Sequence, residues 1–141
     1  CEDAIPPLVA LLKYGTAGGK LQAAGALRKI AYDLDDGDTV VREGAIPPLI
    51  ALLRDGTPEG KIEAAVSLRK IVDDAWNLNY NANVVREGAI PPLIALLRDG
   101  TPEGKIEAAV ALMTLAYDDD DNKVTVAKEG AIPPLIALLE Y

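Results

Sequence analysis

The sequence predicts an all-α fold, an α-solenoid in which units of three helices stack one on the next. The first observation is the motif AIPPL, which starts at Ala4, Ala45, Ala89 and Ala131, at spacings of 41, 44 and 42 residues. The second is that residues 40–66 and 84–110 are identical. A period in this range is typical of helical repeats that pack on their neighbours. The third is composition: 50% of the residues are hydrophobic but only 4% are aromatic, which suits closely packed helices.

The first two helices of a unit are read most easily in the second unit. Asp38 is expected to cap a short first helix over residues 39–43, and Gly44 permits the left-handed backbone that ends it. Pro47 and Pro48 fit the first turn of the second helix, where a missing N–H costs nothing. LIALL, which follows them, is apolar on nearly every side, so this helix should be buried between its neighbours.

The third helix is expected to cover residues 58–72, with Thr57 as its N-cap and Pro58 at its first position. Its apolar residues recur at spacings of three and four, namely Ile62, Ala65, Leu68 and Val72. The string before it, GTPEGK at residues 56–61, resembles a phosphate-binding loop. Such a loop needs four residues between its glycines and a Ser or Thr after the Lys, but three intervene here and Ile62 follows. We therefore interpret the string as a glycine stop and a Thr-Pro helix start.

The periodicity makes residues 1–141 a single domain of about three full units and a partial one. The units are expected near residues 1–37, 38–80, 81–121 and 122–141.

Composition excludes several classes of function. The net charge is −8, from 14 basic and 22 acidic residues, which disfavours binding to nucleic acid or to an anionic membrane. The longest apolar runs are too short to span a bilayer. The chain has no His and one Cys, so the usual general base and zinc ligand are missing, and we expect neither an enzyme nor a cofactor or metal. No signal peptide is visible in a chain that begins at Cys1, and an intracellular location, cytoplasmic or nuclear, is favoured.

Three helices per unit and the strings EGAIPPLIALLRDGTPEGKIEAAVALMTLA and DNKVTVAKEGAIPPL resemble the armadillo repeat. The resemblance covers essentially the whole chain and is nearest to the consensus-like form common in plant, algal and oomycete repeats. It implies a right-handed superhelix whose third helices line a concave groove. In importin-α and β-catenin that groove binds extended peptides, so the resemblance implies a protein-binding scaffold without catalysis.

The family's groove residues are only partly present. In importin-like repeats the third helix carries a peptide-binding Asn and, one turn earlier, a Trp. The Asn positions hold Lys29, Lys70 and Thr114, and the Trp positions hold Gly25, Val66 and Val110. Import of basic nuclear signals is therefore not expected. The same face carries Gln22, Glu63 and Glu107 two turns earlier, Arg28, Arg69 and Met113 beside the Asn positions, and Tyr32, Asp73 and Tyr117 near one turn later.

Arg28, Lys29, Arg69 and Lys70 form a basic stripe along two units. The stripe resembles the β-catenin type of groove and favours an extended acidic peptide as the partner. The alternative is that these cations only solubilise the helices and complement their C-terminal dipoles, and the sequence leaves both interpretations open.

A second open alternative concerns origin. The identical 27-residue blocks fit an engineered or consensus-derived scaffold with no physiological ligand, whereas the unequal spacings of 41, 44 and 42 residues favour a natural repeat array.

Two loop features are interpreted structurally. The Asp-rich runs at residues 33–38 and 118–121 lack the spacing of an EF-hand and are expected to cap helices. Trp76 is expected to cover the adjacent core, and the alternative is that it projects as a binding aromatic.

The two ends of the chain also carry a prediction. No polar capping helix is visible at either end, although repeat arrays usually need one. We expect an open apolar surface at Leu8, Val9 and Leu11, and at Leu135, Ile136 and Leu138, and end-to-end self-association through it.

Overall fold

The computed structural model describes residues 2–33, 37–74, 79–117 and 119–139, and all regular structure in those ranges is helical. In chain order the helices are η1 (Glu2–Ala4), α1 (Ile5–Tyr14), α2 (Ala17–Asp33), α3 (Gly37–Arg42), α4 (Ile46–Asp55), α5 (Pro58–Asp74), α6 (Asn79–Arg86), α7 (Ile90–Asp99), α8 (Pro102–Ala116), α9 (Asp120–Lys128) and α10 (Ile132–Leu139).

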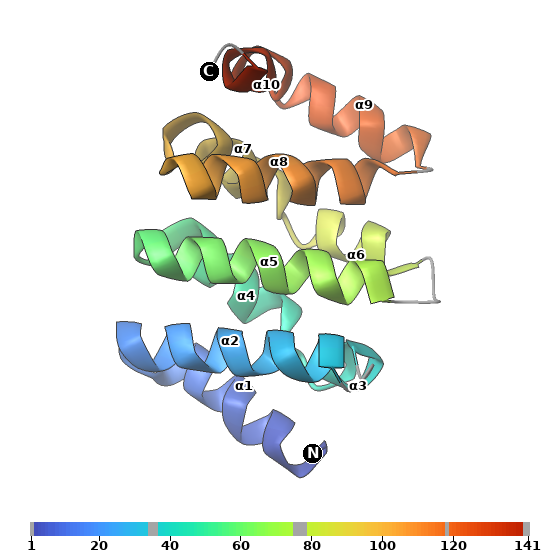
Figure 1. Cartoon of the computed structure of the whole chain (residues 1–141). Helices are drawn as coiled ribbons and strands as arrows, with labels where there is room; N and C mark the ends of the chain where they lie inside the picture. The colour runs from blue at the N-terminus through green and yellow to red at the C-terminus, as the bar shows by residue number, and fades with distance from the viewer. Residues whose placement is uncertain (1, 34–36, 75–78, 118, 140–141) are drawn as a thin grey trace.

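The helices stack in layers along one axis, and Figure 1 views the stack from the side of the long helices α2, α5 and α8. These three are the predicted third helices; α2 packs against α5, and α5 packs against α8. The predicted second helices α1, α4, α7 and α10 form a row behind them. Each of α1, α4 and α7 also packs against the long helix that follows it in the chain. The predicted stack of three-helix units is therefore what the chain forms.

The residues in the turns determine where the helices begin and end. The three glycines before the second helices, Gly44, Gly88 and Gly130, have φ angles of 85°, 93° and 94°, in the left-handed region that only glycine adopts easily. In α4, prolines occupy the first turn as expected, and Gly56 closes the helix with its N–H donating to the Leu52 carbonyl. The Thr57 hydroxyl then accepts from the Gly60 N–H at 3.1 Å, which confirms the predicted cap of α5.

The core is aliphatic and runs continuously through the stack. Ala24, Ala65 and Leu68 are all at most 2% exposed, and the small alanines let successive third helices approach closely. Two buried hydrogen bonds tie neighbouring helices together. Ser67 Oγ donates to the Ala24 carbonyl, from α5 to α2, and Asn122 Nδ2 donates to the Leu115 carbonyl, from α9 to α8.

Several local predictions need correction. The first helix of the second unit covers Gly37–Arg42, so Asp38 lies inside it rather than capping it. The third helix continues two residues beyond Val72, to Asp74. At the N-terminal end Val9 is 4% exposed, because α1 turns this residue into the core, whereas Leu11 is 40% exposed. The interpretation of Trp76 lies outside the described residues.

The Asp-rich run after α8 behaves as predicted where it is described. Asp119 is the N-cap of α9, and its Oδ1 accepts from the Asn122 N–H at 3.0 Å. Within the described ranges, no three His, Cys, Asp or Glu side chains gather as a metal site would require. None of the described helices is long and apolar enough to cross a membrane.

Candidate functional site

The face formed by α2, α5 and α8 carries an open groove of about 600 Å³, which we call the concave groove. Four of the predicted binding residues line it, namely Gln22, Arg28, Lys29 and Glu63. Six more lining residues were not predicted: Leu21, Gly25, Ala26, Glu59, Ile62 and Glu103. Glu59 lies one turn before Glu63 on α5, so helical spacing alone would have placed it on the same face.

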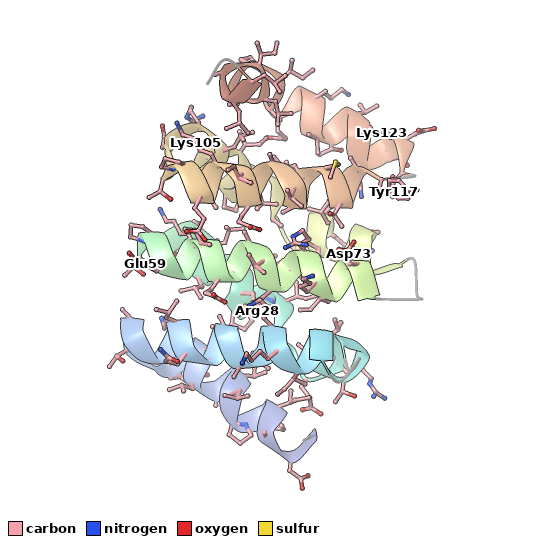
Figure 2. The ribbon with its side chains drawn as sticks, viewed as in Figure 1. Arg28, Glu59, Asp73, Lys105, Tyr117 and Lys123 are labelled. Carbon is pink, nitrogen blue, oxygen red and sulfur yellow. The ribbon has the colours of Figure 1, made fainter. Side chains whose placement is uncertain are left out.

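Ion pairs between successive third helices cross this face. Arg28 Nε donates to Glu63 Oε2 at 3.1 Å, from α2 to α5. One unit further along, Arg69 donates through Nη2 to Glu107 Oε2 at 3.5 Å, from α5 to α8. We call these two pairs the Arg–Glu ladder. Figure 2 labels Arg28 in the space between α2 and α5.

The Arg–Glu ladder means that the two arginines of the predicted basic stripe are paired within the protein. Arg69 also lies 3.8 Å from Asp73 on its own helix, and its side chain is only 17% exposed. Both arginines therefore already contact carboxylates of the protein. Lys29 remains exposed on α2, and Lys70 is half-buried on α5.

Carboxylates dominate the other edge of the concave groove. Glu59 and Glu103 lie in the first turns of α5 and α8, and both are exposed. Figure 2 labels Glu59 at the N-terminal end of α5, far along the helix from Asp73. The groove therefore has an acidic edge near the N-termini of α5 and α8, and Lys29 lines it further along α2.

The other candidates lie in different settings. Val66 is half-buried on α5, and Thr114 on α8 donates its hydroxyl to the Val110 carbonyl. Tyr117 follows the end of α8 and is exposed. Met113 is exposed but lines a different hollow, at the C-terminal end of the stack. Tyr32 lies on α2, and its side chain is outside the described part of the structure.

The string GTPEGK at residues 56–61 is not arranged to bind phosphate. Two of its N–H groups already have acceptors: the Gly60 N–H donates to the Thr57 hydroxyl, and the Lys61 N–H donates to the Thr57 carbonyl. The preceding segment is the helix α4 rather than a strand. The same cap recurs in α2, where Gly19 N–H donates to the Thr16 hydroxyl.

Comparison with known proteins identifies the repeat. The family model described as the Armadillo/beta-catenin-like repeat matches residues 38–73, which span α3, α4 and most of α5. No curated protein sequence matches the chain.

Solved structures match the whole stack. A computationally designed armadillo repeat protein for modular peptide recognition aligns with a TM-score of 0.88 at 28% identity, covering 99% of this chain and 58% of that one. A designed armadillo repeat protein in complex with the peptide (KR)4 has a TM-score of 0.87 at 28% identity, with coverages of 99% and 58%. A further engineered protein has a TM-score of 0.87 at 29% identity, with coverages of 97% and 56%.

The chain thus spans somewhat more than half the length of the solved structures that it matches. The armadillo fold is typically a non-catalytic binding scaffold. Residues 38–73 match the armadillo repeat by sequence, and the chain as a whole has the same fold as the designed armadillo repeat proteins with which it aligns.

Proposed function

We propose that the chain is a non-enzymatic scaffold that binds an extended peptide across α2, α5 and α8. The observation that carries this proposal is the concave groove, an open hollow of about 600 Å³ lined by polar side chains from successive repeats. Regularly spaced side chains of this kind suit a ligand that is itself regular, such as an extended backbone. Peptide binding by this fold has a precedent, since a designed armadillo repeat protein of the same fold was solved in complex with the peptide (KR)4.

The preferred peptide carries acidic residues opposite Lys29 and Lys70. Neighbouring repeats are separated by about 10 Å, one helix-packing distance. An extended chain advances about 3.3 Å per residue, so acidic residues about three apart reach successive repeats. Lysines hold a carboxylate as point charges, without the fixed geometry that Arg offers. Since the chain as a whole is acidic, the attraction is local and weakens with salt.

The arginines contribute less than the sequence suggested. A peptide carboxylate at Arg28 or Arg69 has to displace Glu63 or Glu107, and it leaves that glutamate beside a like charge. Charge reversal at Lys29 and Lys70 is therefore the cleaner test, because it leaves the Arg–Glu ladder intact.

The test compares two fluorescent peptides of equal length, one with Glu at every third position and one with Lys there. The unmodified chain is expected to bind the acidic peptide more tightly, and Lys29→Glu with Lys70→Glu is expected to reverse the order. The matched control is Lys20→Glu with Lys61→Glu. It makes the same change in charge on the same two helices, but these lysines line hollows beside α4 and α7, away from the concave groove.

Three outcomes would contradict parts of the proposal. Tighter binding of the basic peptide to the unmodified chain would reject the lysines as the working residues and favour Glu59 and Glu103. Equal effects of the two double variants would mean that only net charge matters. Binding of neither peptide would support the alternative of a scaffold without a physiological ligand.

A further inference from the structure

The charged residues of the concave groove are not distributed evenly along the stack. Helices α2, α5 and α8 present equivalent positions to this face, because each carries the same stripe of residues at spacings of three and four. On α2 the residues that line the groove include two cations, Arg28 and Lys29, while Gln22 occupies the position that is Glu63 in α5. The described side chains that α2 contributes to the groove therefore carry positive charge alone.

Helices α5 and α8 shift the balance toward negative charge. The stripe of α5 carries both signs. On α8 the same positions hold Glu103 and Glu107 in the N-terminal half, and the uncharged Met113 and Thr114 further along. Across the three described third helices, the face thus changes from basic at α2, through mixed at α5, to acidic at α8. Figure 1 shows the three helices in this order along the stack.

Pairing within the protein leaves charges of opposite sign at the two ends of this gradient. The Arg–Glu ladder takes up both arginines and the two glutamates that face them. Lys29 on α2 and Glu103 on α8 are both exposed, and neither has an ion-pair partner among the described residues. Both line the same hollow, the concave groove of about 600 Å³. One ligand can therefore contact a lysine at one end and a glutamate at the other.

We propose that the ligand of the concave groove is an extended peptide with two charged patches, an acidic patch that lies at Lys29 and a basic patch that lies at Glu103. This inference rests on the proposed peptide-binding function and adds the charge pattern of the ligand. A uniformly acidic peptide is repelled by the carboxylates of α8, and a uniformly basic peptide is repelled by the cations of α2. A peptide with one patch of each sign is attracted at both ends of the groove.

Helix geometry sets the distance between the two patches. On α5, Lys70 is the equivalent of Lys29 and lies eleven residues after Glu59, the equivalent of Glu103. Eleven residues span about 16 Å along a helix axis. Helices α2 and α8 are two helix-packing distances apart, which is about 20 Å. The diagonal between the two positions is therefore about 26 Å, and an extended chain covers it in about eight residues.

The probe is a fluorescent peptide with two Glu at one end, two Lys at the other and about eight Gly and Ser residues between them. The control peptide has the same composition, with one Glu and one Lys at each end. With blocked termini both peptides are neutral, so the net charge of −8 on the chain affects them equally. The chain is expected to bind the peptide with separated patches at least about threefold more tightly than the control, as measured by fluorescence anisotropy. A spacer of about three residues is too short for the diagonal and is expected to remove this preference.

Single charge reversals locate the two patches. Lys29→Glu and Glu103→Lys are each expected to weaken binding of the peptide with separated patches at least about threefold, since each replaces an attraction by a repulsion. The matched controls, Lys13→Glu and Glu43→Lys, reverse exposed charges that do not line the concave groove. They are expected to change the affinity by less than about 1.5-fold. All four positions are exposed, and circular dichroism checks that each variant keeps the fold.

The double variant Lys29→Glu with Glu103→Lys gives a readout that a loss of structure would not produce. It keeps the net charge and reverses the sign at both ends of the groove. The peptide with separated patches is expected to bind it in the opposite direction, with an affinity within about twofold of that for the unmodified chain. Two weakened single variants and a recovered double variant would together support the two patches.

The remaining outcomes separate this inference from the proposed function. Equal binding of the two neutral peptides, or no recovery in the double variant, would overturn the charge pattern, while the peptide with Glu at every third position would still report on the lysines. A loss in Lys13→Glu as large as that in Lys29→Glu would also overturn it, because only net charge would then matter. Binding of none of these peptides would overturn both this inference and the proposed function.

Discussion

The two equivalent leucines Leu53 and Leu139 allow the contribution of packing against neighbouring helices to be measured. Both occupy the last position of IPPLIALL, Leu53 inside α4 and Leu139 at the end of α10, and Leu→Ala lowers the helix propensity at neither position because Ala is the better helix former. Leu53 is 1% exposed and Leu139 is 85% exposed. The free-energy difference between the two variants therefore reports the packing around the side chain and little else.

The expected magnitudes follow from burial. Truncating a buried leucine removes its transfer free energy and leaves a cavity, which costs about 2–5 kcal/mol of unfolding free energy. Leu53→Ala should lie in this range, because α4 is enclosed by α1, α5 and α7. Leu139→Ala removes a side chain that is mostly in water and should cost less than about 0.5 kcal/mol.

Thermal unfolding followed by circular dichroism is a sufficient assay. In a chain of this length 1 kcal/mol corresponds to a change of about 2–4 °C in the melting temperature. A loss of about 3 kcal/mol in Leu53→Ala should therefore lower the melting temperature by about 6–12 °C, and Leu139→Ala should lower it by about 2 °C at most. Equal shifts in the two variants would refute the reasoning, because they would mean that α10 is as well covered as α4.

Three further predictions concern the stack itself. Leu68→Ala should cost about 2–5 kcal/mol and, in hydrogen exchange, should reduce protection in the neighbouring repeats as well as in its own; a purely local change would contradict this. In a double-mutant cycle, Arg28→Met and Glu63→Gln should show a coupling of about 0.2–1 kcal/mol that falls with added salt, since the pair is partly exposed. Gly44→Ala should destabilise by about 1 kcal/mol or more because of its positive φ, whereas Gly18→Ala, in an open helical position, should stabilise by up to about 1 kcal/mol, and chemical denaturation distinguishes the two signs.

The repeats, the helices and most of their ends could be predicted from the sequence, because these features depend on local chemistry. Gly44 adopts the left-handed backbone region, prolines occupy the first turn of α4, and Thr57 caps α5. Each of these features can be recognised from residues within one helical turn. The errors also have local causes. Asp38 was predicted as a cap because Asp is a favoured N-cap residue, but the helix starts at Gly37.

The candidate site was less predictable, since its behaviour depends on contacts between units. Sequence spacing placed Arg28 and Arg69 one repeat apart on the same face, and it could not tell that each meets a glutamate of the next helix. Similarly, Ile46 and Ile132 have the same neighbours in sequence and opposite exposures. What separates them is packing between helices: α4 packs against the long helix α5, and among the described helices no long helix follows α10.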